Sequence, residues 1–362
     1  MTQFAFVQTE PELQQTAEVL RQKQALAIDL ECENNLHHYG AYATLAQISD
    51  GQNSWIIDLL KIRNIQPLLK LFTDPEIQKV FHDVNFDLRI IQNQWQCSLF
   101  NVFDTQLAAL FIGEEKLGLG SLLGKYFNIK TEKKFQRMDW TKRPLSKDQL
   151  SYAAKDAAHL LQLKAALDDQ LIKLERRSWV MEECRHLETL DWSYKEQTYL
   201  DISGVKSLEA PQRAVLHVLF EARKELARKV DKPPFMIFSN KQLLAFSKQP
   251  PTNWVLVKRV HPIVAESAEY LKQLTATASR KPEYLEKSLK QKLTVQQYQW
   301  TKGLLELRTK IGNKLGLKGH LILNNNQVGD IAATQSLDGL RNWQKELIHD
   351  MPLILQILRR EL

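Results

Sequence analysis

The stretch Ala25–Glu31 reads Ala-Leu-Ala-Ile-Asp-Leu-Glu, and it predicts a short buried strand that ends in two acids. Asp29 is the one polar residue between Ala25 and Leu30, and burying an unpaired carboxylate is costly. Because side chains alternate along a strand, Asp29 and Glu31 lie on the same side of it. A divalent cation between them would stabilise two like charges in this position. The alternative is a strand that ends at the surface, where water solvates both acids.

Length and composition describe an ordinary globular protein. The chain has 362 residues, 44% of them hydrophobic and 25% charged, which is enough for two or three domains. No apolar run approaches the roughly 18 residues of a membrane span, and the first residues lack the pattern of a signal peptide. The three cysteines, Cys32, Cys97 and Cys184, are widely spaced and not in metal-ligand spacing. We therefore expect free thiols, a reducing compartment and a cytoplasmic protein without membrane contact.

Charge is distributed unevenly along the chain. Residues 1–205 carry 23 Lys and Arg against 28 Asp and Glu, a net charge of −5, whereas residues 206–362 carry 26 against 14, a net charge of +12. An acidic N-terminal part joined to a basic C-terminal part suggests one part that carries out catalysis and one part that binds a polyanion. Simple solubility of small helical domains is the alternative explanation of the basic half.

Strand and helix patterns alternate up to about residue 174. We expect strands over 25–30, 44–49, 54–60 and 79–81, and helices over 10–23, 65–72, 117–127 and from Ser146 to Leu174. Thr9, Asp83, Asp104 and Ser146 are the predicted N-caps of helices. This order predicts an α/β domain whose mixed sheet is flanked by helices.

The remainder of the chain is predicted to be helical. Residues 186–209 resemble a polar linker, and amphipathic helices are expected over 211–229, 241–247, 262–277, 294–315, 327–334 and 337–349. A weak internal repeat relates Phe220-Glu221-Ala222-Arg223 to Leu305-Glu306-Leu307-Arg308, because each segment is followed by a similar loop and a short helix. Two small all-helical domains of one type would explain this repeat.

Further acids and a tyrosine complete a candidate catalytic constellation with Asp29 and Glu31. Asp87 lies within an otherwise apolar helix face, and Tyr152 and Asp156 lie one turn apart on the long helix. Four carboxylates from separate elements, with oxygen ligands only, are typical of sites for two Mg²⁺ or Mn²⁺ ions in nucleases and polymerases. The tyrosine hydroxyl would orient the attacking water, so that no separate side-chain base is needed.

Several neighbouring residues have two interpretations. Asp104 is either a fifth metal ligand or, as we prefer, a helix cap. His37 and His38 lie in the polar loop 33–42, where two adjacent histidines are potential metal ligands; without a third partner at ligand spacing, a solvated loop beside the substrate is preferred. The basic and aromatic loop 130–143 either guides single-stranded RNA or is a surface loop whose Trp140 packs into the core.

These motifs resemble those of a known nuclease family. Asp29-Leu-Glu31, His82 followed by Asp87, and Tyr152-x-x-x-Asp156 look like the three exonuclease motifs of the DEDD superfamily, and the tyrosine is typical of its DEDDy branch. The segments around Tyr42, around Phe103-Asp104 and over 139–152 are similar to ribonuclease D. The two helical units resemble HRDC domains, which ribonuclease D carries as a tandem pair.

The resemblance implies a fold and a domain order. We expect a ribonuclease H-like mixed α/β sheet in an exonuclease domain over 1–190 and a linker over 191–209. HRDC-like domains would follow over 210–285 and 290–362. The resemblance also implies a monomer.

The resemblance further implies a 3′-5′ exoribonuclease that releases nucleoside 5′-monophosphates and trims tRNA precursors and other structured small RNAs. Two divalent ions, Mg²⁺ or Mn²⁺, would be held by Asp29, Glu31, Asp87 and Asp156, and Tyr152 would orient the nucleophile. His82 would touch the terminal nucleotide or the scissile phosphate, and Lys134 and Arg137 of the 130–143 loop would bind the substrate.

Two other functions compete with this one. A DNA 3′-5′ exonuclease of proofreading or repair type would use the same metal site, since such a site does not read the sugar. A nucleic-acid-binding protein with a decayed nuclease fold would need no catalysis, but the presence of all four acids and the tyrosine argues against it.

Overall fold

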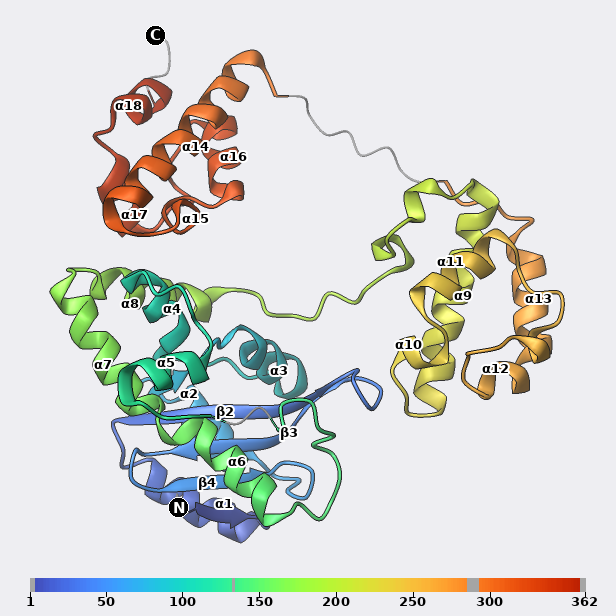
Figure 1. Cartoon of the computed structure of the whole chain (residues 1–362), viewed down its shortest axis with the longest axis horizontal. Helices are drawn as coiled ribbons and strands as arrows, with labels where there is room; N and C mark the ends of the chain where they lie inside the picture. The colour runs from blue at the N-terminus through green and yellow to red at the C-terminus, as the bar shows by residue number, and fades with distance from the viewer. Residues whose placement is uncertain (1–3, 132–133, 285–292, 359–362) are drawn as a thin grey trace.

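The computed structural model describes residues 4–131, 134–284 and 293–358. It contains an N-terminal α/β domain and two helical units (Figure 1). The fold class predicted from the sequence, a mixed sheet flanked by helices and followed by helical bundles, is confirmed. Among the described residues, none of the helices is both long enough and apolar enough to cross a bilayer.

Within the described residues, six strands form one mixed sheet in the order β1-β4-β3-β2-β5-β6. Strand β2 is antiparallel to β3 and parallel to β5, so it lies in the middle of the sheet. It runs to Asn34 rather than ending near Leu30 as predicted, and its register with β3 shifts between Glu31 and Cys32. The strands are β1 (Phe4–Val7), β2 (Ala25–Asn34), β3 (Ala41–Ser49), β4 (Ser54–Asp58), β5 (Gln78–Phe81) and β6 (Val102–Asp104).

Helices cover both faces of this sheet. The even-numbered apolar residues of β2, Leu26, Ile28 and Leu30, pack in one core with α1, α2 and α3, whereas α6 and α7 contact the sheet from the other side. The odd-numbered residues of β2, which include Asp29 and Glu31, therefore face α6 and α7. The helices are α1 (Glu10–Leu20), α2 (Gln66–Thr73), α3 (Asn85–Trp95), α4 (Thr105–Ile112), α5 (Leu119–Phe127), α6 (Lys147–Ala158), α7 (Leu160–Lys173) and α8 (Arg177–Thr189).

The observed starts of the helices can be compared with the predicted N-caps. Thr9 and Ser146 form capping boxes at the starts of α1 and α6, as predicted. The long helix predicted from Ser146 to Leu174 is wrong in one respect, because it divides at His159 into α6 and α7. The sequence pattern does not predict helix α8, because the last part of this helix falls within the predicted linker 186–209.

The first helical unit covers residues 199–284. Its core surrounds α9, and residues of the predicted linker, among them Tyr199 and Leu208, pack into this core. Its elements are η1 (Tyr199–Asp201), η2 (Val205–Ser207), α9 (Ala210–Lys229), α10 (Pro234–Ile237), α11 (Asn240–Lys248), η3 (Trp254–Leu256), α12 (Ile263–Glu266) and α13 (Ala268–Ala278).

The second helical unit, residues 293–358, repeats part of the first. In the first unit Arg223 donates hydrogen bonds to the Phe238 carbonyl and to Asn240 Oδ1. In the second unit Arg308 donates to the Leu323 carbonyl and to Asn325 Oδ1 with the same spacing. The internal repeat seen in the sequence is therefore also a repeat of contacts. The elements are α14 (Val295–Leu315), α15 (Gly319–Ile322), α16 (Asn325–Thr334), α17 (Asn342–Ile348) and α18 (Pro352–Leu358).

The second unit shares a hydrophobic core with the N-terminal domain. Trp343 stacks on Trp179 of α8 with ring centroids 4.9 Å apart, and its ring meets Phe111 edge-on. The buried Arg176 donates to the carbonyls of Phe111 and Leu315 and so joins the two parts. In Figure 1 this unit lies above α8 and α4.

The first unit touches the N-terminal domain through the β2–β3 loop. His38 Nδ1 lies 2.6 Å from Asp231 Oδ2, and His38 Nε2 lies 3.3 Å from Asp139 Oδ2. The next residue, Tyr39, packs against the core of the first unit and lies under the Arg228 guanidinium, 5.3 Å from its ring centroid.

Candidate active site

Three carboxylates converge at the middle of the sheet. Asp29 and Glu31 come from β2 and Asp156 comes from α6, and one oxygen of each lies within 4.8 Å of the others. Asp87, at the start of α3, adds a fourth buried carboxylate whose charge acts on both Asp29 and Glu31. The structure thus brings together the four acids that the sequence had singled out.

Burial governs the electrostatics of this cluster. Loss of solvent raises the pKa of Asp29 to about 7, and burial together with the charge of Asp29 raises the pKa of Asp156 to about 8. Burial, reinforced by the neighbouring acids, also raises the pKa values of Glu31 and Asp87 well above their ordinary range. Among the described residues, no Lys, Arg or His forms a salt bridge with any of the four. Clustered oxygen donors without a protein cation fit a hard divalent ion such as Mg²⁺ or Mn²⁺.

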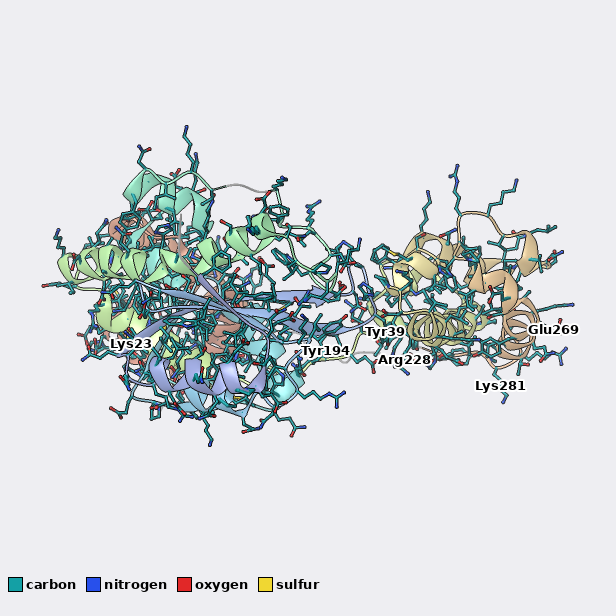
Figure 2. All side chains as sticks on the ribbon, turned by 90° about the horizontal axis from the view of Figure 1, so that it is seen from below. Lys23, Tyr39, Tyr194, Arg228, Glu269 and Lys281 are labelled. Carbon is teal, nitrogen blue, oxygen red and sulfur yellow. The ribbon has the colours of Figure 1, made fainter. Side chains whose placement is uncertain are left out.

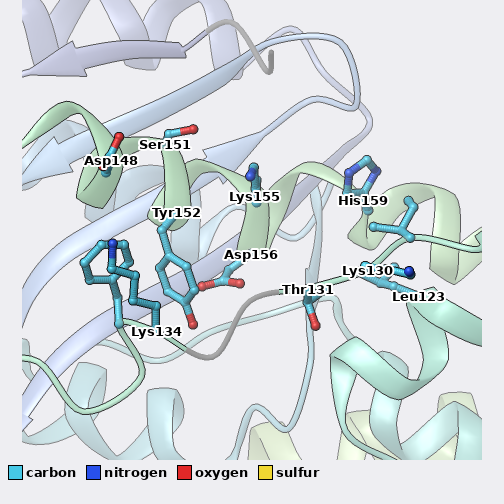
Figure 3. Close-up of a pocket in the computed structure, with 12 residues that line it drawn as sticks. Leu123, Lys130, Thr131, Lys134, Asp148, Ser151, Tyr152, Lys155, Asp156 and His159 are labelled. Carbon is cyan, nitrogen blue, oxygen red and sulfur yellow. The ribbon is translucent and has the colours of Figure 1, made fainter.

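Tyr152 lies beside this cluster, one turn before Asp156 on α6 (Figure 3). Two aromatic rings of the 130–143 loop fix its position: Phe135 meets it edge-on at 5.4 Å, and Trp140 stacks on it at 6.2 Å. Burial and the charge of Asp156 raise the pKa of the phenol, so its hydroxyl keeps its proton and can donate a hydrogen bond. Trp140 is buried, as predicted for a core residue.

A cavity of about 260 Å³ opens next to Tyr152 and Asp156. Its walls are α6 on one side and residues 129–131 and 134–135 on the other, and Lys134 and Lys155 line it (Figure 3). Lys134, a predicted substrate-binding residue, therefore lies at the mouth of the candidate site. Arg137 is exposed but does not line this cavity.

His82 follows strand β5, as predicted. Its Nδ1 lies 2.9 Å from Thr105 Oγ1, whereas its Nε2 is buried without a hydrogen-bond partner among the described residues. Burial lowers the pKa of this imidazole, which favours the neutral ring. Its contact with substrate stays a prediction.

The predicted cap at Asp83 is wrong, because α3 begins at Asn85 and Asp83 adopts a positive φ of 63°. The carboxylate of Asp104 accepts hydrogen bonds from the backbone N–H groups of Asp83 and Val84, the two residues before α3. It also accepts from Gln106 and Leu107 at the start of α4. Asp104 is therefore a helix cap, as preferred, and its oxygens are occupied by backbone donors.

Two further arrangements were missed from the sequence. Arg143, counted among the basic residues of the 130–143 loop, forms a bidentate pair with the buried Asp58 and so anchors the loop. One oxygen or nitrogen from each of Glu33, His37 and Asp139 also lies within 4.8 Å of the others, which supplies the partners that the sequence had not revealed. Backbone N–H groups of the β2–β3 loop already occupy one Glu33 oxygen, which favours a loop-shaping role. Cys32, Cys97 and Cys184 have free thiols, as predicted.

Comparisons with known proteins agree with this geometry. Residues 4–172 match the family model described as 3′-5′ exonuclease, and residues 212–275 match the HRDC domain model.

The chain carries a 3′-5′ exonuclease domain and an HRDC domain.

This exonuclease is similar over most of its length to other nucleases. It is 28% identical to ribonuclease D of Pseudomonas paraeruginosa over 356 residues, which cover 94% of both chains. The catalytic core of RRP6 from Trypanosoma brucei superposes with a TM-score of 0.70 at 26% identity, over 77% of this chain and 80% of that one. RNase D of Escherichia coli shares the fold over 99% of both chains, with a TM-score of 0.72 and 23% identity.

Proposed function

We propose that the exonuclease is a 3′-5′ exoribonuclease with two divalent ions, Mg²⁺ or Mn²⁺, in the carboxylate cluster. It removes nucleoside 5′-monophosphates from the 3′ ends of tRNA precursors and other structured small RNAs. The observation that carries this proposal is the convergence of Asp29, Glu31 and Asp156 within 4.8 Å. The similarity to ribonuclease D over nearly the whole chain supports RNA as the substrate.

Each residue of the site has a proposed role. Asp29, Glu31, Asp87 and Asp156 hold the ions, which supply the positive charge that activates an attacking water and stabilises the leaving oxygen. Tyr152, fixed by Phe135 and Trp140, donates or accepts a hydrogen bond that orients this water.

The proposed substrate contacts rest on observations separate from the carboxylate cluster. Lys134 lines the cavity beside Asp156 and would contact a phosphate of the 3′ end. His82 and the exposed Arg137 are proposed as further contacts to the terminal nucleotides.

The helical units are proposed to hold the RNA. Residues 206–362 carry 26 basic against 14 acidic residues, and such a surplus favours a polyanion at a distance from the reacting end. The contacts shared by Arg223 and Arg308 support a second, HRDC-like domain after the one that the family model matches. The DEDDy branch, a monomeric state, a cytoplasmic location and the domain boundaries at 190, 210, 285 and 290 stay predictions.

A gel time course tests this function directly. With Mg²⁺ present, a 3′-extended tRNA should shorten stepwise while a DNA strand of matching length changes little, and EDTA or the Asp29→Asn substitution should stop the reaction. Equal or faster loss of the DNA would instead assign the protein to the repair class of exonucleases. Undiminished turnover by the Asp29→Asn variant would contradict the proposed metal site.

A further inference from the structure

A second, larger cavity of about 520 Å³ lies where the exonuclease domain meets the HRDC domain. Its walls come from the β2–β3 loop and α3, from residues 194–197 of the connecting segment, and from α9, α10 and the start of α11. Figure 2 shows Tyr39, Tyr194 and Arg228 at this junction. The volume lies in the range of sites that bind small ligands.

Aromatic rings from all three walls line this cavity. Tyr194 and Phe235 are 49% and 51% exposed, although rings of this size are normally buried. Phe86 of α3 and Phe220 of α9 provide apolar surface deeper in the cavity. Exposed rings beside a channel are the usual platform on which proteins stack the bases of single-stranded nucleic acid, because every base offers a flat face.

Positive charge accompanies these rings. Arg89 of α3 is exposed and forms no ion pair with any of the described residues. Arg223 is buried, and its Nε has no partner in that same set of residues. Lys224, by contrast, is neutralised by Glu196 at 2.6 Å. Arg89 thus offers the cavity an exposed guanidinium group that no acid among the described residues neutralises, and such groups bind phosphate oxygens well.

Two elements, β2 and α3, contribute residues both to this cavity and to the active site. Phe86 lines the cavity, and the next residue on α3 is Asp87 of the carboxylate cluster. Asn34 lines the cavity at the end of β2, three residues beyond Glu31, a separation of about 10 Å along a strand. A single-stranded chain whose 3′ end lies at the carboxylates can therefore reach the cavity with a nucleotide a few positions upstream.

We propose that this interdomain cavity binds an upstream nucleotide of the RNA substrate, with its base on Tyr194 and Phe235 and its phosphate on Arg89. The inference rests on the proposed ribonuclease function and adds a subsite to it. Substrates too short to reach the cavity do not use this subsite. A longer single strand gains affinity from it before each cleavage.

Substrate length separates this subsite from the active site. The variants Tyr194→Ala, Phe235→Ala and Arg89→Ala should each raise KM about tenfold for a single-stranded RNA of about 12 nucleotides, as expected for the loss of one stacked base or phosphate contact. The value of kcat/KM for a dinucleotide should stay unchanged. Tyr298→Ala, which removes a 65% exposed ring from α14, and Arg21→Ala, which removes an exposed charge from the end of α1, are matched controls and should leave both substrates unaffected.

A crosslinking experiment tests whether RNA binds in the cavity without the need for any cleavage. The Asp29→Asn protein is irradiated with RNAs that carry 5-iodouridine at successive upstream positions, and an adduct on Tyr194 or Phe235 is expected from one or two of these positions. Adducts confined to other residues, an unchanged KM for the longer RNA, or an equal loss on the dinucleotide would each overturn the subsite. If the wild-type protein does not shorten RNA at all, the proposed function fails, and the crosslinks still decide whether the cavity holds a nucleotide.

Discussion

At the scale of single residues, the position of Tyr152 is set by neighbours that take no part in the chemistry. Its ring is held between Phe135 and Trp140 of one loop. Arg143 anchors that loop to the sheet through the buried Asp58 and the Thr44 carbonyl. The orientation of the Tyr152 hydroxyl therefore depends on a loop that is itself fixed to the sheet. Such support keeps a reacting group in position, so that the site need not rearrange during the reaction.

The Tyr152→Phe variant should lose about 10²-fold or more in kcat with little change in KM, since it removes one oriented hydrogen bond at the reacting water. Its ring packing remains, so a divalent ion should stabilise this variant against heat by as much as we expect for the wild type. Asp29→Asn is expected to lose that thermal shift together with activity. Tyr126→Phe, which removes a hydroxyl bonded to Glu114, is the matched control and should keep wild-type turnover. An unchanged kcat for Tyr152→Phe would contradict the role given to the hydroxyl.

Local periodicity explains which site residues could be predicted from the sequence. Asp29 and Glu31 share a strand face and Tyr152 and Asp156 share a helix face, so spacing alone places each pair. The pairing of Arg143 with Asp58 joins residues 85 apart in the chain, and no local pattern indicates it. The same holds for the interdomain cavity, whose three walls come together only once the domains are packed.

At the scale of elements, Asp104 links the starts of two helices. Its carboxylate is 3% exposed and accepts backbone hydrogen bonds from Asp83 and Val84, the two residues before α3, and from the first turn of α4. The sequence predicts the cap of α4, because that cap is local, but the bonds to Asp83 and Val84 join residues about 20 apart in the chain, which no local pattern indicates. Asp87 lies in the first turn of α3, so these bonds also help to position a carboxylate of the active site.

The Asp104→Ala variant should therefore lose the cap of α4 together with the two hydrogen bonds that fix the residues before α3. A single cap contributes about 0.5–2 kcal/mol, so we expect a loss of roughly 1–4 kcal/mol and a fall in Tm of several degrees. Thr9→Ala removes one capping box at the distant helix α1 and should cost about half as much. Thermal unfolding followed by circular dichroism compares the two variants. A smaller effect for Asp104→Ala than for Thr9→Ala would contradict the double role.

At the scale of the whole molecule, the two helical units are attached in different ways. The second unit shares an apolar core with the exonuclease domain through Trp343 and Phe111. Deleting residues 206–362 would therefore expose that core. A loss of RNA affinity in such a truncation would not by itself measure how much the basic residues contribute to RNA binding. Single substitutions at exposed basic residues measure this contribution better, because they leave the packing intact.

The first unit, the HRDC domain, is attached to the exonuclease domain by a contact that includes a titratable group, His38. The hydrogen bond from His38 to Asp231 raises the pKa of His38, and the same bond lowers the pKa of Asp231. Asp139 faces the other ring nitrogen, while Lys142 lies 4.0 Å from Asp139 Oδ2 and Arg228 packs on the neighbouring Tyr39. A group whose pKa is raised by folding stabilises the folded contact fully below its unfolded pKa, about 6.5 for histidine. That contribution disappears as the pH rises through the raised value.

The junction should therefore loosen as the pH rises from below the ordinary pKa of histidine, about 6.5, through the raised pKa of His38. Small-angle X-ray scattering should record this as an increase in radius of gyration, because the HRDC domain moves away from the β2–β3 loop. The His38→Ala variant should have a larger radius at low pH and little dependence on pH, since the imidazolium that joins Asp139 to Asp231 is gone. His349→Ala removes a histidine that pairs with Asp350 away from the junction and should follow the wild-type curve. A wild-type radius that stays constant over this range would mean that apolar packing around Tyr39, rather than charge, holds the HRDC domain in place.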